Sequence, residues 1–444
     1  MFRTTPPPAR SISMVQWLAL AGLLVILIAA ESYALYTVFT SKFPGGNDFF
    51  VYWLGGRAYL LDGANPFSPA VAEKIQLAVF GRPVQPGDKD QAYFAYPLYS
   101  LYFSWPLSLL PYPWARAIWM TLLQFMLLAI TGLSIRLAGW RPPTWLFGLT
   151  LLWGILLYNG ARAIILGQFS ILVALALLLA LWAIEQRRDG WAGILLAITT
   201  IKPQMVILLL FFLLVWALRQ RRWWLLGSFG ASMLALLLSS LLLIPAWPLD
   251  FWRNTLAYAS YIRFGTPLEN LLHYFLPSQL AAPLTLILTG LLFLALLPGW
   301  WLAWRTPPDD RGTPLPPSRS QGTSLPPSRE RGGPGGGHYT WAVMSTLIIG
   351  NLITFRSATT NQMLLYLPLF FFFRRLPQPR GNVIAALVEV GLAVFMWSVF
   401  ITTLEGNWEN VMMHGLLPAL MLLLYALDWP ALRRTAQLQE QPYA

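Results

Sequence analysis

The stretch LGQFSILVALALLLALWAIEQRRDGWAGILLAITTIKPQMVILLLFFLLVWALRQRRW, residues 166–223, contains three apolar runs separated by short polar groups. Its charged residues lie almost entirely at the ends of the runs, in EQRRDG at 185–190 and in RQRRW at 219–223. Lys202 is the exception, and Pro203 after it disfavours helix at the lysine. The pattern is typical of membrane-crossing helices, with the second and third runs forming a hairpin that is broken at TTIKPQ.

The composition of the chain agrees with this pattern. Of its 444 residues, 57% are hydrophobic and only 11% are charged, whereas soluble domains carry about a quarter charged residues. The net charge of +12 suggests nucleic-acid binding, but the Lys and Arg residues cluster at the ends of apolar runs. That distribution is the signal that orients membrane spans. We therefore expect membrane lipid as a partner and no nucleic acid. Cys is absent, so the chain has no disulfide framework.

The positions of the spans follow from hydropathy, and their orientation follows from the Lys and Arg bias. We predict an all-α, polytopic transmembrane helical bundle that forms one integral membrane domain over residues 1–444, with about twelve spans (eleven to thirteen) and both termini in the cytoplasm. The first apolar run resembles a signal peptide, but it is too long and no small-residue cleavage site follows, so we interpret it as a retained span. The predicted spans are Met14–Tyr36, Trp114–Ile135, Trp145–Tyr158, Phe169–Ile184, the two halves of the hairpin in Trp191–Leu218, Trp223–Ala246, Leu280–Trp304, Thr340–Thr354, Met363–Phe373, Val383–Thr402 and Val411–Leu427.

Two segments between the spans are long. Residues 41–113 form a large outer loop that contains a predicted interfacial helix, AVAEKIQLAVF, whose Val71, Ile75, Ala78 and Val79 share one face. The loop ends in FAYPLYSLYFSWPLSLL, which is too short to span comfortably, so we expect a re-entrant or interfacial segment. Residues 306–338 hold the near-repeat TPLPPSRS and TSLPPSRE followed by GGPGGG, a composition that predicts a disordered cytoplasmic linker.

Polar residues that gather on the outer face are the candidates for chemistry. In GGNDFFVYW, residues 45–53, Asp48 is either the N-cap of a helix or a reactive carboxylate. Lys202 and Arg356 each interrupt an apolar stretch at a helix break, and charges at membrane depth usually face a bundle interior or a watery cavity. Arg57, Arg162 and Arg263 are alternatively ordinary interfacial anchors, because arginine snorkels easily. His273 and His414 are isolated and lack paired acids, so we expect no metal site.

The order and spacing of four stretches resemble glycosyltransferase family 87, a mannosyltransferase-like branch of the GT-C superfamily of membrane enzymes. The stretches are NDFFVYWLGGRAYLLDGANPF at 47–67, FAYPL at 94–98, the segment 166–223, and TTNQMLLYLPL at 359–369. The resemblance covers most of residues 40–375. Asn361 and Gln362 stand where many members have histidines, which leaves the acceptor and the sugar open.

The resemblance implies a GT-C-type bundle and an inverting enzyme that transfers a sugar, with mannose as the expectation, from a polyprenyl-phosphate donor to a lipid or glycan acceptor on the outer face of the plasma membrane. A lipid phosphate leaves as a stable anion, so one base suffices where a glycosidase needs an acid as well. Asp48 is the expected base, and Lys202, Arg356 and Arg263 are expected to hold the donor phosphate. We expect no cofactor and no metal requirement. Substrate contacts are expected from Asn47, Tyr52, Gln168, Asn270, Asn361 and Gln362.

Two other classes of protein fit the composition. A lipid or sugar transporter or flippase also needs many spans and intramembrane polar groups, but such proteins often carry matching broken helices in two halves. The break at Lys202 has no convincing counterpart elsewhere in the chain, and an outer loop of this length is unusual for a transporter. A non-catalytic scaffold would leave both Asp48 and Lys202 without a role.

Overall fold

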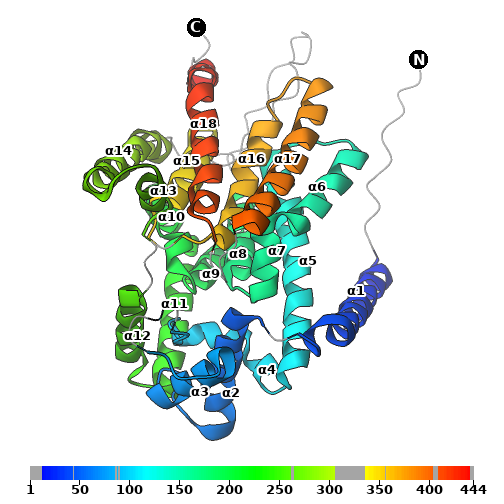
Figure 1. Ribbon diagram of the computed structural model, residues 1–444. Helices are drawn as coiled ribbons and strands as arrows, with labels where there is room; N and C mark the ends of the chain where they lie inside the picture. The colour runs from blue at the N-terminus through cyan, green and yellow to red at the C-terminus, as the bar shows by residue number, and fades with distance from the viewer. Residues whose placement is uncertain are drawn as a thin grey trace.

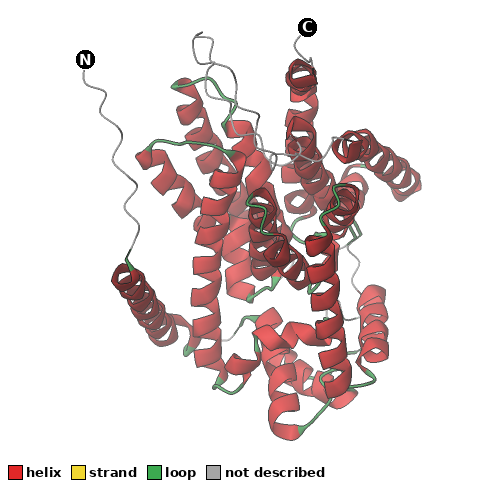
Figure 2. Ribbon diagram, turned by 180° about the vertical axis from the view of Figure 1, so that it is seen from behind, coloured by secondary structure: helices red, strands yellow, loops and turns green. Residues whose placement is uncertain are grey.

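The computed structural model describes residues 13–43, 45–85, 88, 91–261, 265–305, 336–355, 357–403 and 409–440. Every regular element among these residues is helical, and no strand occurs in them (Figure 2). The prediction of an all-α chain is therefore confirmed for the described part of the molecule.

The structure contains both long helices and short ones. The first half of the chain contains α1 (Met14–Leu35), η1 (Tyr36–Thr40), α2 (Asn47–Asp62), α3 (Pro69–Phe80), η2 (Leu98–Phe103), α4 (Trp105–Ser108), α5 (Tyr112–Ala138), α6 (Thr144–Leu156), α7 (Tyr158–Leu166), α8 (Ser170–Glu185), α9 (Asp189–Thr199), η3 (Pro203–Met205) and α10 (Ile207–Arg219). The second half contains α11 (Trp223–Leu243), α12 (Trp247–Tyr261), α13 (Pro267–Phe275), α14 (Ser278–Arg305), α15 (Gly336–Ile353), η4 (Thr359–Leu365), α16 (Tyr366–Phe373), α17 (Arg380–Thr403) and α18 (Val411–Glu440).

Several of these helices are long and apolar enough to cross a membrane. Within the described ranges, α1 with η1, α5, α11, α14 and α17 meet that criterion, which gives 5, and the bent pair of α6 and α7 raises the number to 6. Their outward side chains are apolar, with Trp224 82% and Leu242 86% exposed on α11. Such surface is unfavourable in water and suited to lipid. The chain is a multi-pass membrane protein, while the total of about twelve spans stays a prediction.

The hairpin predicted at TTIKPQ is present. The helix α9 ends at Thr199 and α10 begins at Ile207, with η3 between them. Arg222, which follows α10, forms an ion pair with Asp189 at the start of α9 and donates to the Ile184 carbonyl at 3.1 Å. The two ends of the hairpin therefore meet, as the charge pattern predicted, and Lys202 lies at the opposite end.

The segment 41–113 forms a compact lower part that lies at the bottom of Figure 1 and contains α2, α3 and α4. The predicted helix α3 is present and buries Val71 and Ile75, but Ala78 is exposed, so the buried face is rotated from the predicted one. The segment 94–110 forms only the short η2 and α4, in agreement with a stretch too short to span.

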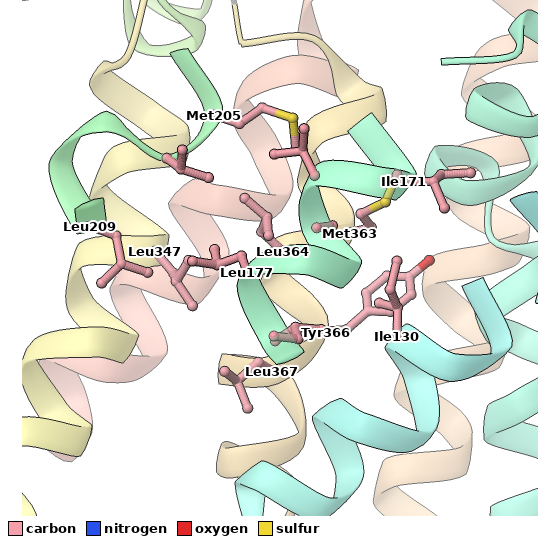
Figure 3. Close-up of a cluster of buried hydrophobic side chains, with 14 of the residues drawn as sticks. Ile130, Ile171, Leu177, Met205, Leu209, Leu347, Met363, Leu364, Tyr366 and Leu367 are labelled. Carbon is pink, nitrogen blue, oxygen red and sulfur yellow. The ribbon is translucent and has the colours of Figure 1, made fainter. Parts of the chain in front are cut away.

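The core of the molecule lies between α5, α8, α15 and η4. Figure 3 shows Ile130, Leu177 and Leu347 of the three helices around Met363 and Leu364 of η4. This apolar packing anchors η4 from one side, and the polar residues of η4 are consequently held in a defined position.

Two other segments of the molecule bear on the predictions. The helix α1 contacts the rest of the molecule near its C-terminal end through a Ser32–Thr121 hydrogen bond of 3.2 Å. The adjoining η1 adds a stack of Tyr36 on Trp114 at 3.8 Å between centroids. Residues 306–335 of the predicted linker lie outside the described residues, and Gly336 to His338, which we placed in the linker, begin α15.

Candidate active site

Asp48 follows a glycine turn that the start of α5 holds in place. Gly46 has φ of 71°, and a Cβ there would lie 2.8 Å from both the Arg116 Nε and the Tyr112 hydroxyl. The Tyr112 hydroxyl donates to the Gly46 carbonyl at 3.0 Å, and Arg116 donates to the Phe43 carbonyl at 2.9 Å. Only glycine fits this close contact with a positive φ, so the backbone before Asp48 is fixed.

The N-cap interpretation of Asp48 is wrong. The N-cap of α2 is Gly46, in the left-handed conformation, and Asp48 is the second residue of the helix. An acid in the first turn is stabilised by the positive end of the helix dipole. Because the carboxylate is not needed as a cap, it is available to another group.

Gln168 reaches Asp48 through a tight contact between α7 and α2. Gly167, between α7 and Gln168, has φ of 75°, and a Cβ on it would lie 2.4 Å from the Phe49 Cβ. The Trp119 indole donates to the Gly167 carbonyl at 2.9 Å, and its ring stacks on Phe49 with 5.6 Å between centroids. Gln168 is thereby placed beside the first turn of α2.

Lys202 lies in the break between α9 and η3, outside the candidate spans, and is only 5% exposed. Burial lowers the pKa of Lys202 to about 8, and the negative charge of Asp48 partly offsets this by favouring the ammonium form. The neighbouring Thr200 is held by the Tyr99 hydroxyl, 3.0 Å from the Thr200 Oγ1. A lysine in this environment changes protonation near neutral pH far more easily than a surface lysine.

One amide connects the carboxylate and the ammonium group. The Gln168 Nε2 donates to the Asp48 Oδ2 at 2.6 Å, and the Gln168 Oε1 accepts from the Lys202 Nζ at 2.7 Å. A carboxylate only accepts and an ammonium only donates, so these partners fix the orientation of the amide. The three residues form one polar chain, Asp48–Gln168–Lys202, although 120 positions separate the first two and 34 positions separate the last two.

Aromatic rings border this polar chain. Tyr52, one turn after Asp48, is fully buried and stacks on Phe169 with 4.2 Å between centroids. Tyr96, from the FAYPL stretch, meets Tyr52 edge-on at 4.9 Å. Residues of three stretches singled out in the sequence, 47–67, 94–98 and 166–223, therefore meet here, with aromatic rings next to the residues that carry the carboxylate and the amide.

Comparison with known proteins identifies the family. The sequence model of glycosyltransferase family 87 matches residues 94–316, half of the chain. The chain belongs to glycosyltransferase family 87. No curated protein and no solved structure matches it. The matched residues of this family 87 protein include Gln168 and Lys202, while Asp48 lies before them.

Membership of the family makes the protein a membrane glycosyltransferase. Of the residues that we expected to serve the glycosyltransferase, the structure brings together Asp48, Gln168 and Lys202, with Tyr52 beside them. Asn47 is the first residue of α2 and is partly buried next to Asp48. Arg263 and Arg356, the other predicted phosphate ligands, lie outside the described residues.

The remaining predicted amides of the family 87 chain lie in other elements. Asn270 belongs to α13, which packs against α14, α15 and α18, and it accepts from the Gly265 backbone NH at 3.2 Å. Gln362 is buried and bonded at both ends, accepting from the Asn159 Nδ2 at 2.7 Å and donating to the His414 carbonyl at 2.7 Å. Asn361 donates to the Ser357 hydroxyl at 3.4 Å.

A second polar cluster of the glycosyltransferase was missed in the sequence. Glu409, just before α18, accepts hydrogen bonds from the Tyr158 hydroxyl at 2.6 Å and from the Thr359 hydroxyl at 2.7 Å. Arg162 Nε lies 3.5 Å and His414 Nε2 lies 3.3 Å from its carboxylate oxygens. We call Tyr158, Arg162, Thr359, Glu409 and His414 the Glu409 cluster. We expected His414 to lack a paired acid, and this expectation is wrong, because Glu409 lies beside it. The described residues contain no group of three or more metal-ligating side chains.

Proposed function

We propose that this glycosyltransferase transfers mannose from a polyprenyl-phosphate donor to a glycolipid or glycan acceptor on the outer face of the membrane, with inversion at the anomeric carbon. The observation that carries the proposal is the Asp48–Gln168–Lys202 chain, in which one carboxylate and one ammonium group are held apart by a single amide. An inverting transfer needs a base on one side of the sugar carbon and a charge partner for the leaving group on the other.

Asp48 acts as the general base in this proposal. It accepts the proton of the acceptor hydroxyl while that oxygen forms the new bond to the anomeric carbon. The bond from this carbon to the phosphate oxygen breaks, and the electron pair leaves with polyprenyl phosphate. The first-turn position of Asp48 in α2 favours its ionised form, which is the form a base needs.

Lys202 holds the donor phosphate in this proposal. Its ammonium group is buried and has a neutral amide oxygen, that of Gln168, as an acceptor. A phosphate that entered the site would bring the second negative charge that this cation can stabilise, and the interaction is strong in a site from which water is excluded. Lys202 would stabilise both the bound donor and the charge that develops on the leaving phosphate.

The experiment that tests the proposal is a transfer assay on the purified protein with polyprenyl-phosphate mannose, in which Asp48→Asn is compared with the wild type. We expect transfer to fall at least about a hundredfold, the usual contribution of a general base, with an unchanged melting temperature. Retention of a tenth of the wild-type rate would remove Asp48 from the role of base. Transfer from polyprenyl-phosphate glucose but not mannose would overturn the sugar assignment alone.

A further inference from the structure

The Glu409 cluster connects three elements that are far apart in the sequence. Tyr158 and Arg162 come from α7, Thr359 comes from η4, and Glu409 and His414 flank the start of α18. The side chains of Arg162, Glu409 and His414 are 16%, 11% and 8% exposed. The three side chains are therefore largely buried, and each keeps a small exposed fraction.

Buried polar atoms without partners occur in residues next to Tyr158 and Thr359 of this cluster. The Asn159 Oδ1, the Thr360 Oγ1 and the Asn361 Oδ1 have no hydrogen-bond partner among the described residues. Each belongs to a residue that is at most 2% exposed and that lies within two positions of Tyr158 or Thr359. A buried polar group without a partner destabilises the folded state, because it has lost its hydrogen bonds to water. Three such groups in one place indicate that a molecule carrying hydrogen-bond donors completes the site.

The chemistry of the site identifies the class of molecule. The unpartnered atoms need donors, while Arg162 and His414 supply donors and Glu409 accepts. Tyr158 is fully buried, and its ring packs on Phe400 at 4.8 Å between centroids, which ties the cluster to α17. Adjacent hydroxyl groups, as in a hexose, offer hydrogen-bond donors and acceptors at the same time.

The position of the site relates it to the polar chain at Asp48. Tyr158 begins α7 and Gln168 follows its end. The helix has 9 residues and is about 14 Å long at 1.5 Å per residue. A short oligosaccharide can reach from one end of such a helix to the other.

We propose that the Glu409 cluster, together with Asn159, Thr360 and Asn361, binds the hydroxyl groups of a hexose during transfer. The inference rests on the proposed transferase function and adds a sugar subsite to it. The hexose belongs either to the donor or to the acceptor, and the two sources share the chemistry that the site recognises.

Thr360→Val is the most direct test, because it removes a buried hydroxyl that has no partner in the structure and keeps the shape of the side chain. If the residue were only structural, the variant would be as stable as the wild type or more stable. If the site binds a hexose, we expect the KM of one sugar substrate to rise about threefold to tenfold, the effect of one neutral hydrogen bond. A rise in the donor KM places the donor sugar in the site, and a rise in the acceptor KM places the acceptor there.

Thr289→Val in α14 is the matched control, because it removes another buried hydroxyl without a partner. Binding of p-nitrophenyl α-mannoside, α-glucoside and α-galactoside to protein in nanodiscs, measured by titration calorimetry, separates this inference from the transferase proposal because it needs no turnover. We expect Thr360→Val and Glu409→Gln to weaken hexoside binding and Thr289→Val to leave it unchanged. Equal binding in Thr360→Val and Thr289→Val, or no hexoside binding to the wild type, would overturn the inference whatever the transfer assay gives.

Discussion

The Asp48–Gln168–Lys202 chain and the Glu409 cluster both contain one partly buried carboxylate, but the groups around the two carboxylates differ. Asp48 accepts a hydrogen bond from the Gln168 amide, which in turn accepts one from Lys202. Glu409 is close to Arg162 and His414 and also accepts from two hydroxyl groups. Asp48 is thus linked to an ammonium group through one neutral amide, whereas Glu409 contacts side chains from three elements.

The difference assigns the two regions different tasks. The separated pair at Asp48 and Lys202 is suited to a reaction in which a proton moves to one group and negative charge develops next to the other. The carboxylate of Glu409, which contacts side chains from α7, η4 and α18, is suited to holding a ligand and three helical segments in place. Variants of the two regions should therefore have different effects on catalysis and on binding.

The largest contrast is expected between the two carboxylates. Asp48→Asn lowers kcat at least about a hundredfold, whereas Glu409→Gln changes kcat less than about tenfold and acts mainly on a sugar KM, because it removes binding and no proton transfer. Steady-state kinetics on both variants, with melting temperatures as the control for folding, measure the contrast. An equal loss of kcat in both would show that the two carboxylates share the chemistry.

The next effect concerns the cation. Lys202→Met raises the donor KM and lowers kcat, each by about tenfold or more, because the same ammonium group stabilises bound phosphate and developing charge. Lys202→Arg restores part of this, since the two cations differ in shape and hydration. Lys202→Cys supplies a topological control in a chain without cysteine. Labelling only from the cytoplasmic side would contradict both the hairpin orientation and the phosphate role.

The pH profile separates the two regions further. The burial that lowers the pKa of Lys202 to about 8 leaves the ammonium form present below that pH and removes it as the pH rises. We expect kcat/KM for the donor to fall about tenfold by pH 9 in the wild type and not in Lys202→Arg. We expect Glu409→Gln to show the same decrease in kcat/KM with pH as the wild type. A flat profile in the wild type would mean that Lys202 is not needed as a cation.

The helix α7, which links the two regions, gives a prediction about stability. Gly167→Ala places a Cβ 2.4 Å from the Phe49 Cβ at a positive φ. We expect this variant to lower the free energy of unfolding by about 2–4 kcal/mol. Gly63 has a φ of 63° and no atom lies within 4 Å of a Cβ built on it. Gly63→Ala should therefore lower the free energy of unfolding by only about 1 kcal/mol. Thermal unfolding in detergent compares them. Equal stability would mean that α7 does not rest on α2.

The smallest effect is expected from the segment 306–335. Its composition cannot form a packed core, and in our topology it lies on the face opposite both polar regions. Replacing it with a shorter Gly/Ser segment should change transfer and hexoside binding by less than about twofold, because the predicted topology places it on the cytoplasmic side. A large loss in the same assays would show that the segment takes part in the reaction.

The Asp48 region was largely predictable and the Glu409 cluster was not, although both have similar local signals. Lys202 before Pro203 marked a helix break, and the Lys and Arg pattern marked the hairpin around it. Glu409 also precedes an apolar run, as Asp48 does, and the same criterion applied to the last outer loop would have found it. Its partners Tyr158 and Thr359 lie 251 and 50 positions away, and hydropathy does not specify which helices pack together.

The structure also corrected the local interpretation of Asp48. The residue type and its place before an apolar run favoured a cap. The cap is Gly46, because contacts from Arg116 and Tyr112 require a glycine turn at that point. Such contacts come from α5, which is remote in the sequence, so propensity alone could not predict them. Gln168 was expected to touch substrate, and its bonds to both charged groups became evident only when α7 was placed against α2.

The sparse attachment of α1 has a consequence for how the chain tolerates change. Only 6% of its most apolar window is buried, and its anchors, Ser32 and Tyr36, lie at the C-terminal end. Residues 14–27 therefore meet lipid tails, which distinguish length and apolarity but not the order of side chains. This part of the helix has to be long and apolar, and it does not form a packed surface. An unrelated apolar helix of equal length grafted there should insert and fold as well as the original, whereas Tyr36 and Ser32 should not be exchangeable.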